Sequence, residues 1–154
     1  MIFSQFGYQA WKYDRDEVEV RYQRVLDGLK RVTEAGIKYD AIAVHGTSGT
    51  WLAAALVMGG YNVVMIRKDG ERSHGDCVEG SYTGEQQITD LVFIDDLIVT
   101  GNTITTAQDI LIREGEKAQG YYSENTIPKF VAIVLHNQFV SKGETHEGIP
   151  LFGY

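Results

Sequence analysis

The chain has little proline, a single cysteine and no long apolar run. Its 154 residues include two prolines and one cysteine, Cys77, so no internal disulfide framework can form. No apolar stretch approaches the ~20 residues that a helix needs to cross a bilayer. Met1–Arg15 lacks the basic-then-apolar pattern of a secretory signal. We therefore expect a cytoplasmic protein that has no membrane segment.

Positive charge is also scarce. The formal net charge is −7, with 14 basic and 21 acidic residues, which leaves no broad basic surface to attract a nucleic-acid backbone. The basic residues that lie close together, Arg67, Lys68 and Arg72, suit a small anionic ligand better than a polymer. We expect no nucleic-acid partner.

The chain has the length and composition of one globular domain. Apolar residues make up 44% of the sequence, which is enough for a sizeable core at this length. There are no repeats, low-complexity tracts or linkers, so we interpret residues 1–154 as a single domain.

The order of apolar segments predicts an α/β fold with a mainly parallel central sheet flanked by helices. Helical spacing or composition predicts helices, and short apolar runs predict buried strands. The predicted helices are 14–35, 53–58 and 103–113, and the predicted strands are 41–44, 62–66, 91–94 and 130–135. The polar stretch 67–87 has no clear period and predicts a long loop.

Ligands on such sheets bind at the carboxyl ends of the strands. The segments after Val44, Ile66 and Ile94 all leave predicted strand ends. We expect them to converge on one cleft.

The most informative segment is 91–103, which has the sequence LVFIDDLIVTGNT. Asp95 and Asp96 are adjacent like charges at a strand end, an arrangement that is accommodated when they accept hydrogen bonds from vicinal hydroxyls or face a metal. The segment 100–103 offers backbone N–H groups, a glycine and two hydroxyls at a helix start, which together form an anion cradle. Each feature alone is more often a turn or a helix cap. In succession, they describe a ribose 5-phosphate site.

This segment closely resembles the signature of the type I phosphoribosyltransferases, in which four apolar and two acidic residues precede a Thr-Gly-x-Thr phosphate loop. The resemblance implies the fold of that family with a small or reduced hood. It also implies that Asp95 and Asp96 hold the ribose hydroxyls of phosphoribosyl pyrophosphate (PRPP). The residues that would surround the 5-phosphate are Val99, Thr100, Gly101, Asn102 and Thr103.

The stretch from Arg67 and Lys68 to Arg72-Ser-His-Gly75 resembles the catalytic loop of the orotate phosphoribosyltransferases. The resemblance implies that Arg67, Lys68 and Arg72 bind pyrophosphate and that Lys68, Arg72 and His74 act in catalysis beside Asp95 and Asp96. Arg72 stands where that group has a lysine. Arginine can neutralise pyrophosphate but does not readily donate a proton.

The stretch 44–50 occupies the place of the family's pyrophosphate loop. Backbone donors and hydroxyls would come from Gly46, Thr47, Ser48 and Gly49, ahead of the next helix. The alternative is a plain strand-to-helix turn.

The resemblance covers about residues 38–113 and implies Mg²⁺-dependent transfer of the 5-phosphoribosyl group from PRPP to a nitrogenous base, orotate or another nucleobase, with release of pyrophosphate. Mg²⁺ would be held mainly by PRPP and through water by Asp95 and Asp96. The resemblance also implies a homodimer and a place in nucleotide salvage or biosynthesis. A non-catalytic PRPP sensor with the same fold is the main alternative. A phosphatase that uses Asp95 ranks far behind, because its second carboxylate has the wrong spacing.

The nitrogenous base would be recognised by a hood outside the core, which spans about residues 38–135. The hood candidates are residues 1–13 and 136–154, with the aromatic residues Phe6, Tyr8, Trp11, Phe139 and Phe152.

Overall fold

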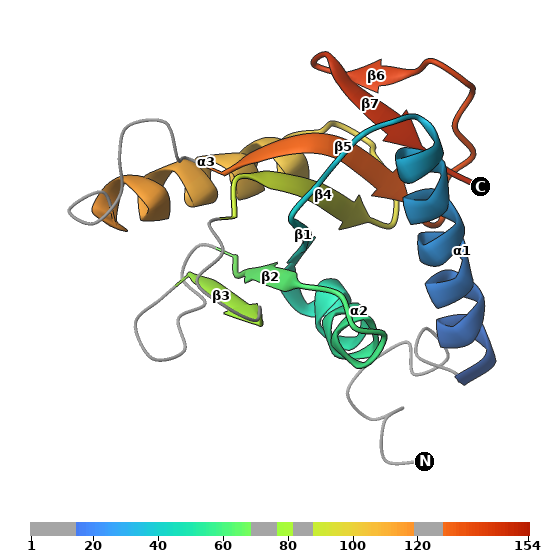
Figure 1. Cartoon of the computed structure of the whole chain (residues 1–154), viewed down its shortest axis with the longest axis horizontal. Coiled ribbons are helices and arrows are strands. Elements are labelled where there is room, and N and C mark those ends of the chain that lie inside the picture. The colour runs from blue at the N-terminus through green and yellow to red at the C-terminus, as the bar shows by residue number, and fades with distance from the viewer. Residues whose placement is uncertain (1–14, 69–76, 82–87, 119–127) are drawn as a thin grey trace.

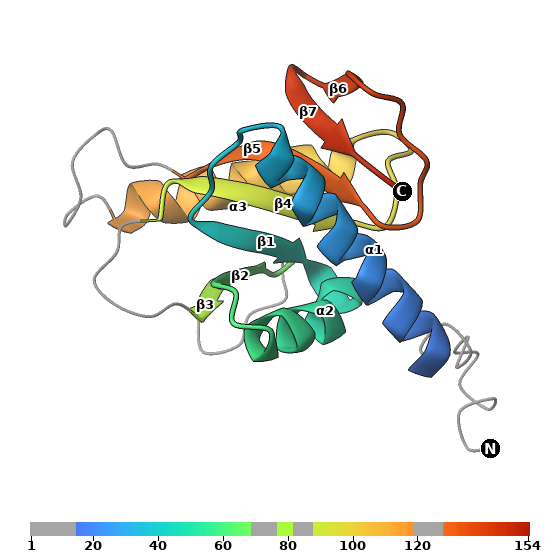
Figure 2. The same cartoon turned by 45° about the vertical axis from the view of Figure 1, so that its right-hand side comes forward.

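The computed structural model describes residues 15–68, 77–81, 88–118 and 128–154. These residues form helices on both faces of a central sheet (Figures 1 and 2). The helices of the described part are α1 (Arg15–Glu34), α2 (Gly46–Met58) and α3 (Asn102–Ala118). The strands are β1 (Ala41–His45), β2 (Val63–Ile66), β3 (Val78–Ser81), β4 (Asp90–Asp95), β5 (Lys129–Leu135), β6 (Thr145–His146) and β7 (Ile149–Phe152).

The sheet is mixed but mainly parallel. Its seven described strands follow the order β3-β2-β1-β4-β5-β7-β6. The central strands β2, β1, β4, β5 and β7 run parallel, and the edge strands β3 and β6 are antiparallel to their neighbours. The predicted α/β class, with a mainly parallel sheet flanked by helices, is confirmed.

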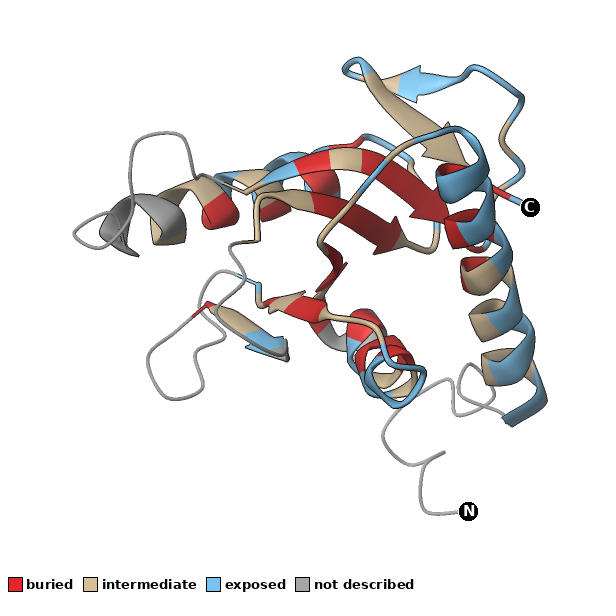
Figure 3. Cartoon of the chain, in the orientation of Figure 1, coloured by how far each residue is buried: buried red, intermediate tan, exposed pale blue. Residues whose placement is uncertain are grey.

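Side chains of the central strands alternate between two core clusters. In β1, Ile42 and Val44 pack with residues of α1 and α2, whereas Ala41 and Ala43 pack with residues of α3. Both faces of the sheet are therefore covered by helices, which is why the central strands are continuous apolar runs rather than alternating ones. Figure 3 shows the buried residues gathered in these strands and on the helix faces that meet them.

Two expectations about element boundaries need correction. The helix predicted over 53–58 begins earlier, at Gly46, directly after β1. The stretch 67–87, predicted as a loop, contains β3, in which Val78 pairs with Ile66 of β2. An edge strand is hydrogen-bonded to one neighbour only and is less buried than a central strand. It can therefore form without a long apolar run. The other predicted helices and strands are confirmed, within one to five residues at their ends.

The C-terminal tail extends the sheet beyond the last predicted strand. Strand β7 lies parallel to β5, with Ile133 opposite Leu151 and Val134 opposite Phe152. Phe152, a hood candidate, is half-buried against the core cluster that includes α1. The N-terminal hood candidate, residues 1–13, lies outside the described residues.

Helix α1 holds the end of this tail. Arg31 donates a hydrogen bond to the carbonyl of Gly153, and the guanidinium of Arg24 lies 4.0 Å from the ring centroid of Tyr154. Within the part of the chain that is described, no helix combines the length and apolar character that crossing a membrane requires.

Candidate functional site

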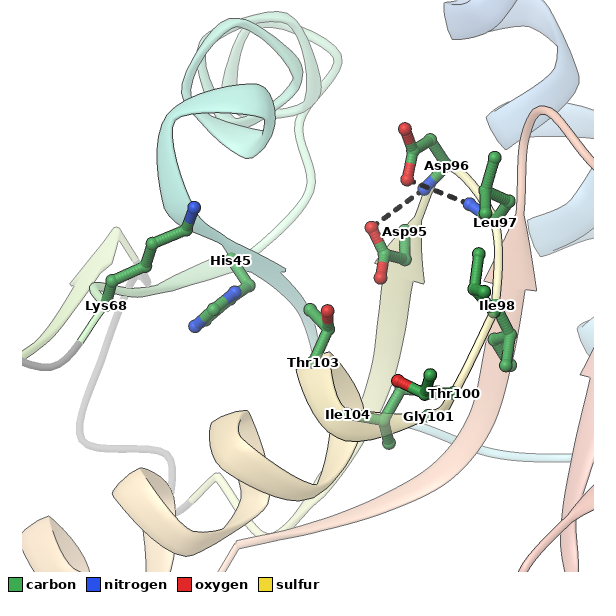
Figure 4. A pocket seen from close by; sticks show the side chains of 11 residues that line it. His45, Lys68, Asp95, Asp96, Leu97, Ile98, Thr100, Gly101, Thr103 and Ile104 are labelled. Atoms are coloured by element: carbon green, nitrogen blue, oxygen red, sulfur yellow. Dashed lines mark hydrogen bonds between the residues drawn. The ribbon is translucent and has the colours of Figure 1, made fainter.

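A cavity of about 270 Å³ lies at the carboxyl ends of β1, β2 and β4 (Figure 4). His45 ends β1, Lys68 follows β2 and Asp95 ends β4, and all three line the cavity. The segments after Val44, Ile66 and Ile94 therefore meet at one cleft, as the strand pattern predicts. The segment between β4 and the first turn of α3 supplies the other lining residues: Asp96, Leu97, Ile98, Val99, Thr100, Gly101, Thr103 and Ile104.

The backbone of the two aspartates is fixed by the neighbouring strand end. His136 N–H donates to the carbonyl of Asp95 at 3.1 Å, and Asn137 N–H donates to that of Asp96 at 2.9 Å. One oxygen of each carboxylate accepts a hydrogen bond from the next residue: Asp96 N–H donates to Asp95 Oδ1, and Leu97 N–H donates to Asp96 Oδ1, both at 2.9 Å (Figure 4). These contacts leave further acceptor capacity on both carboxylates.

The environment of Asp95 favours its protonated form. The pKa of Asp95 is raised to about 7, mainly by burial at the strand end and also by the charge of Asp96. The N–H of Asp96 and the charge of Lys68 act in the opposite direction but do not cancel the effect of burial. A half-buried carboxyl with a strongly raised pKa, placed beside a second carboxyl and a lysine, is typical of functional sites.

The turn between Ile98 and α3 is tight and depends on Gly101. The backbone of Gly101 has φ 79°, a left-handed conformation that favours glycine. Its carbonyl accepts hydrogen bonds from Ile104 N–H and Thr105 N–H, both at 3.1 Å, and Thr100 Oγ1 accepts one from Asn102 N–H at 3.3 Å.

The first turn of α3 thus opens at the cavity, where the first N–H groups of a helix lack carbonyl partners within the helix. Together with the hydroxyls of Thr100 and Thr103, which also line the cavity, they can donate hydrogen bonds to an anion, and we call this turn the anion cradle. The side chain of Asn102 is exposed beside it, without lining the cavity.

Lys68 approaches the start of α2. Gly46 has φ 64°, and a Cβ atom at this position would lie 3.0 Å from Cε of Lys68. The absence of a side chain at Gly46 therefore lets the lysine stem cross the helix start. Lys68 therefore lines the same cavity as the carboxylates, together with His45, which immediately precedes α2.

Arg67 is turned away from this arrangement. Its guanidinium makes an ion pair with Glu79 of β3, with a distance of 2.9 Å between Arg67 Nη2 and Glu79 Oε2. Lys68 and Arg67 are neighbours in the chain, so the extended backbone directs their side chains to different sides. Of these two predicted site residues, Lys68 lines the cavity and Arg67 holds the edge strand.

The predicted pyrophosphate loop is helical. Gly46, Thr47, Ser48 and Gly49 form the first turn of α2 rather than a loop ahead of it. A Cβ atom at Gly49 would lie 3.0 Å from Cβ of Val44, which places Gly49 against β1. The donors in this stretch are therefore the N–H groups of a helix start. The side chains of Thr47 and Ser48 lie outside the description, as do the predicted catalytic residues Arg72 and His74.

Sequence reasoning missed two contributions from the tail. Gln138 Oε1 accepts a hydrogen bond from Ile98 N–H at 2.8 Å and so holds the turn after Asp96. His146 of β6 lies against Gly101. The Glu-Gly pair at 147–148 was a turn signal that could have revealed the hairpin, but nothing in the sequence indicates which loop the hairpin contacts.

No known protein-family model matches the chain, and no curated protein shows significant similarity to it.

Proposed function

We propose that the chain binds PRPP in the cavity at the carboxyl ends of β1, β2 and β4, and transfers its 5-phosphoribosyl group to a nitrogenous base. The observation that carries the proposal is the convergence of three chemical elements on one cavity. Two adjacent carboxylates and an anion cradle come from the single segment 95–103, and Lys68 comes from another strand end. The resemblance of segment 91–103 to the type I phosphoribosyltransferase signature supports the same ligand.

Each part of PRPP has a partner in this proposal. The ribose hydroxyls donate to Asp95 and Asp96, whose carboxylates have acceptor capacity left. The 5-phosphate accepts hydrogen bonds from the turn at Thr100–Thr103. The pyrophosphate lies toward Lys68 and the start of α2, where positive charge and free N–H groups meet.

The donor set suits Mg²⁺ only as an ion that PRPP brings with it. No cluster of three or more metal-ligating side chains occurs in the described part of the chain. The two carboxylates are hard oxygen donors, which can reach a hydrated Mg²⁺ through water. When bound, Mg²⁺ supplies Lewis-acid neutralisation of the leaving pyrophosphate.

The chain's own residues would assist displacement of pyrophosphate from C1 of the ribose by a ring nitrogen. Ionised Asp95 and Asp96 lie where they can stabilise positive charge that develops on the ribose. Lys68 offsets charge on the leaving group. Arg67 would have to leave Glu79 to join it, and Arg72 and His74 would act from the loop that follows.

The base is expected at the apolar rim of the cavity. Leu97 and Val99 line the cavity yet are 37% and 82% exposed, and Phe139, next to the loop-holding Gln138, is 71% exposed. Exposed apolar side chains around a polar cleft favour a flat, partly apolar ligand. A homodimer that shares the loop between subunits remains part of the proposal.

Binding is tested by titrating PRPP with Mg²⁺ into the wild-type protein and the Asp96→Asn variant in a calorimeter. Loss of one charged acceptor is expected to weaken binding by about 10- to 100-fold. The matched control is Asp109→Asn, which removes an exposed carboxylate from α3. Equal affinity of both variants and the wild type would count against the site.

Catalysis is tested separately, because a non-catalytic PRPP sensor is a second candidate. The engagement of Arg67 with Glu79 and the presence of Arg72 in place of a lysine favour this alternative. Pyrophosphate release would be measured with orotate, uracil, adenine, guanine, hypoxanthine and xanthine. Release that depends on one base identifies an enzyme and its substrate. Tight PRPP binding without release from any base identifies the sensor.

A further inference from the structure

The ring of His146 occupies the space in which a side chain at position 101 would lie. A Cβ atom on Gly101 would be 2.3 Å from Cε1 and 2.7 Å from Nε2 of His146. His146 is not among the residues that line the cavity, whereas Gly101 is. The imidazole therefore backs the anion cradle on the side of Gly101 that faces away from the cavity.

The tail holds this ring firmly in place. His146 pairs with Ile149 across a turn in which Glu147 has φ 49° and Gly148 has φ 81°. Positive φ at both central residues is typical of a type I′ turn, the tightest common hairpin connection. Cross-strand partners lie on the same face of a ladder, and Ile149 packs against the core cluster that contains Ile104 of α3. The same packing directs His146 toward the start of α3.

Polar contacts do not explain the position of the ring. Nε2 of His146 is buried and has no hydrogen-bond partner among the described residues. A buried polar atom without a partner is rare in folded proteins and requires an explanation. Its ring edge faces the one glycine whose left-handed backbone shapes the cradle, so contact with Gly101 is what the side chain provides.

We propose that His146 is a positioning residue for the anion cradle: its ring supports the backbone of Gly101 and holds the N–H groups of residues 100–103 in the conformation that binds a phosphate. That this phosphate is the 5-phosphate of PRPP rests on the proposed function. The support itself does not. The C-terminal hairpin, which shares no chain segment with the signature, thereby becomes part of the binding site.

The support is tested without any ligand, by amide hydrogen exchange in the full chain. His146→Ala is expected to speed the exchange of the Ile104 and Thr105 amides, which donate to the carbonyl of Gly101, by about tenfold, while β1 amides keep their rates. Thr145→Ala is the control, because Thr145 lies beside His146 in the same strand with an exposed side chain. His146→Phe is expected to keep the slow exchange, because it retains a ring. Unchanged exchange in His146→Ala, or equal acceleration in Thr145→Ala or His146→Phe, would overturn the proposal.

The consequence for binding is tested with ribose 5-phosphate as the probe. His146→Ala is expected to raise the Kd about tenfold, and Thr145→Ala and His146→Phe are expected to leave it unchanged. If the enzyme assay is positive, His146→Ala should raise KM for PRPP and leave kcat unchanged, because His146 contacts Gly101 and does not line the cavity. A wild-type protein that binds neither ribose 5-phosphate nor PRPP would refute the proposed function, and the exchange experiment would still decide the role of His146.

Discussion

Two aspartates at opposite ends of the same sheet have opposite electrostatic environments. Asp40 immediately precedes β1 at the amino ends of the parallel strands, and Asp95 ends the neighbouring strand β4 at the carboxyl ends. Oδ2 of Asp40 accepts hydrogen bonds from Thr89 N–H at 2.9 Å, Asp90 N–H at 3.0 Å and Thr89 Oγ1 at 3.2 Å. The Asp95 carboxylate instead has Asp96 as its partner: Asp96 N–H donates to Oδ1 at 2.9 Å, and a side-chain hydrogen bond with Asp96 raises the pKa of Asp95.

Because their surroundings differ, the pKa values of the two carboxyls are shifted in opposite directions. The N–H groups of Asp90 and Thr89 lower the pKa of Asp40, because they stabilise its charged form. At Asp95, burial, with the charge of Asp96, outweighs the N–H of Asp96, and the pKa is raised to about 7. Asp40 joins the starts of β1 and β4, so its charge stabilises the fold. Asp95 is kept short of donors beside a cavity, which makes its ionised form a strong acceptor for a ligand.

The largest expected effect is that Asp95→Asn makes the ligand-free protein more stable but weakens its binding of PRPP. At pH 8, Asp95→Asn is expected to raise the free energy of unfolding of the ligand-free protein by on the order of 1–2 kcal/mol, because it removes a charge that burial disfavours. Solvent that reaches the side chain through the cavity screens its charge and keeps the gain in stability small. The same variant is expected to bind PRPP at least tenfold more weakly. Urea denaturation and calorimetry measure the two quantities.

A variant that loses stability and keeps its affinity for PRPP would break the comparison, because Asp95 would then behave as a structural residue. Both measurements are made in one buffer, and Asp109→Asn again controls for the loss of a negative charge on the protein.

The same substitution at Asp40 is expected to act in the opposite way. Asp40→Asn replaces the charged acceptor of two N–H groups with a neutral one and should lower the free energy of unfolding by about 1 kcal/mol. Affinity for PRPP should stay within about twofold of the wild type, because Asp40 and the cavity lie at opposite ends of the sheet. A large loss of affinity would show that the amino end of the sheet also shapes the cavity.

Much of the fold could be predicted from the sequence, because the central strands are buried on both faces. Such strands are continuous apolar runs, and 41–44, 62–66, 91–94 and 130–135 all correspond to strands of the sheet. The edge strands β3 and β6 were missed, and so was the short C-terminal strand β7. Strand β3 contains one apolar residue, Val78, and β6 has only two residues, so neither has a hydrophobic period to detect.

The candidate site also has a part that could be predicted from the sequence and a part that could not. Asp95, Asp96 and the turn at Thr100–Thr103 are contiguous, so their proximity follows from the chain itself. Lys68 could be placed by the rule that parallel strands end at one edge of the sheet. Gln138 and His146 reach the turn by contacts that only the folded tail creates, and the division of roles between Lys68 and Arg67 depends on the position of Glu79 in an unpredicted strand.

The pH dependence of stability is the smallest expected change from one pH unit to the next, and it distinguishes the two aspartates most directly. The proton of Asp95 dissociates near pH 3.8 in the unfolded chain but near pH 7 in the folded one. The folded state therefore binds more protons between these values, so stability should fall as pH rises through this window and level off above it. We expect a slope of roughly 0.5 kcal/mol per pH unit, below the limit of about 1.4 kcal/mol for one proton. The contribution of Asp40 has the opposite sign and is lost only as pH falls below 3.8.

The contributions of Asp95 and Asp40 can be distinguished by measuring the free energy of unfolding in EDTA between about pH 4.5 and 8. The difference between Asp95→Asn and the wild type should grow across this range, because only the wild type carries the titrating carboxyl. The curve for Asp40→Asn should run parallel to the wild type, because Asp40 is ionised in both states throughout. If the difference in unfolding free energy between Asp95→Asn and the wild type stays constant with pH, burial does not raise the pKa of Asp95. The two aspartates would then differ only in their hydrogen bonds.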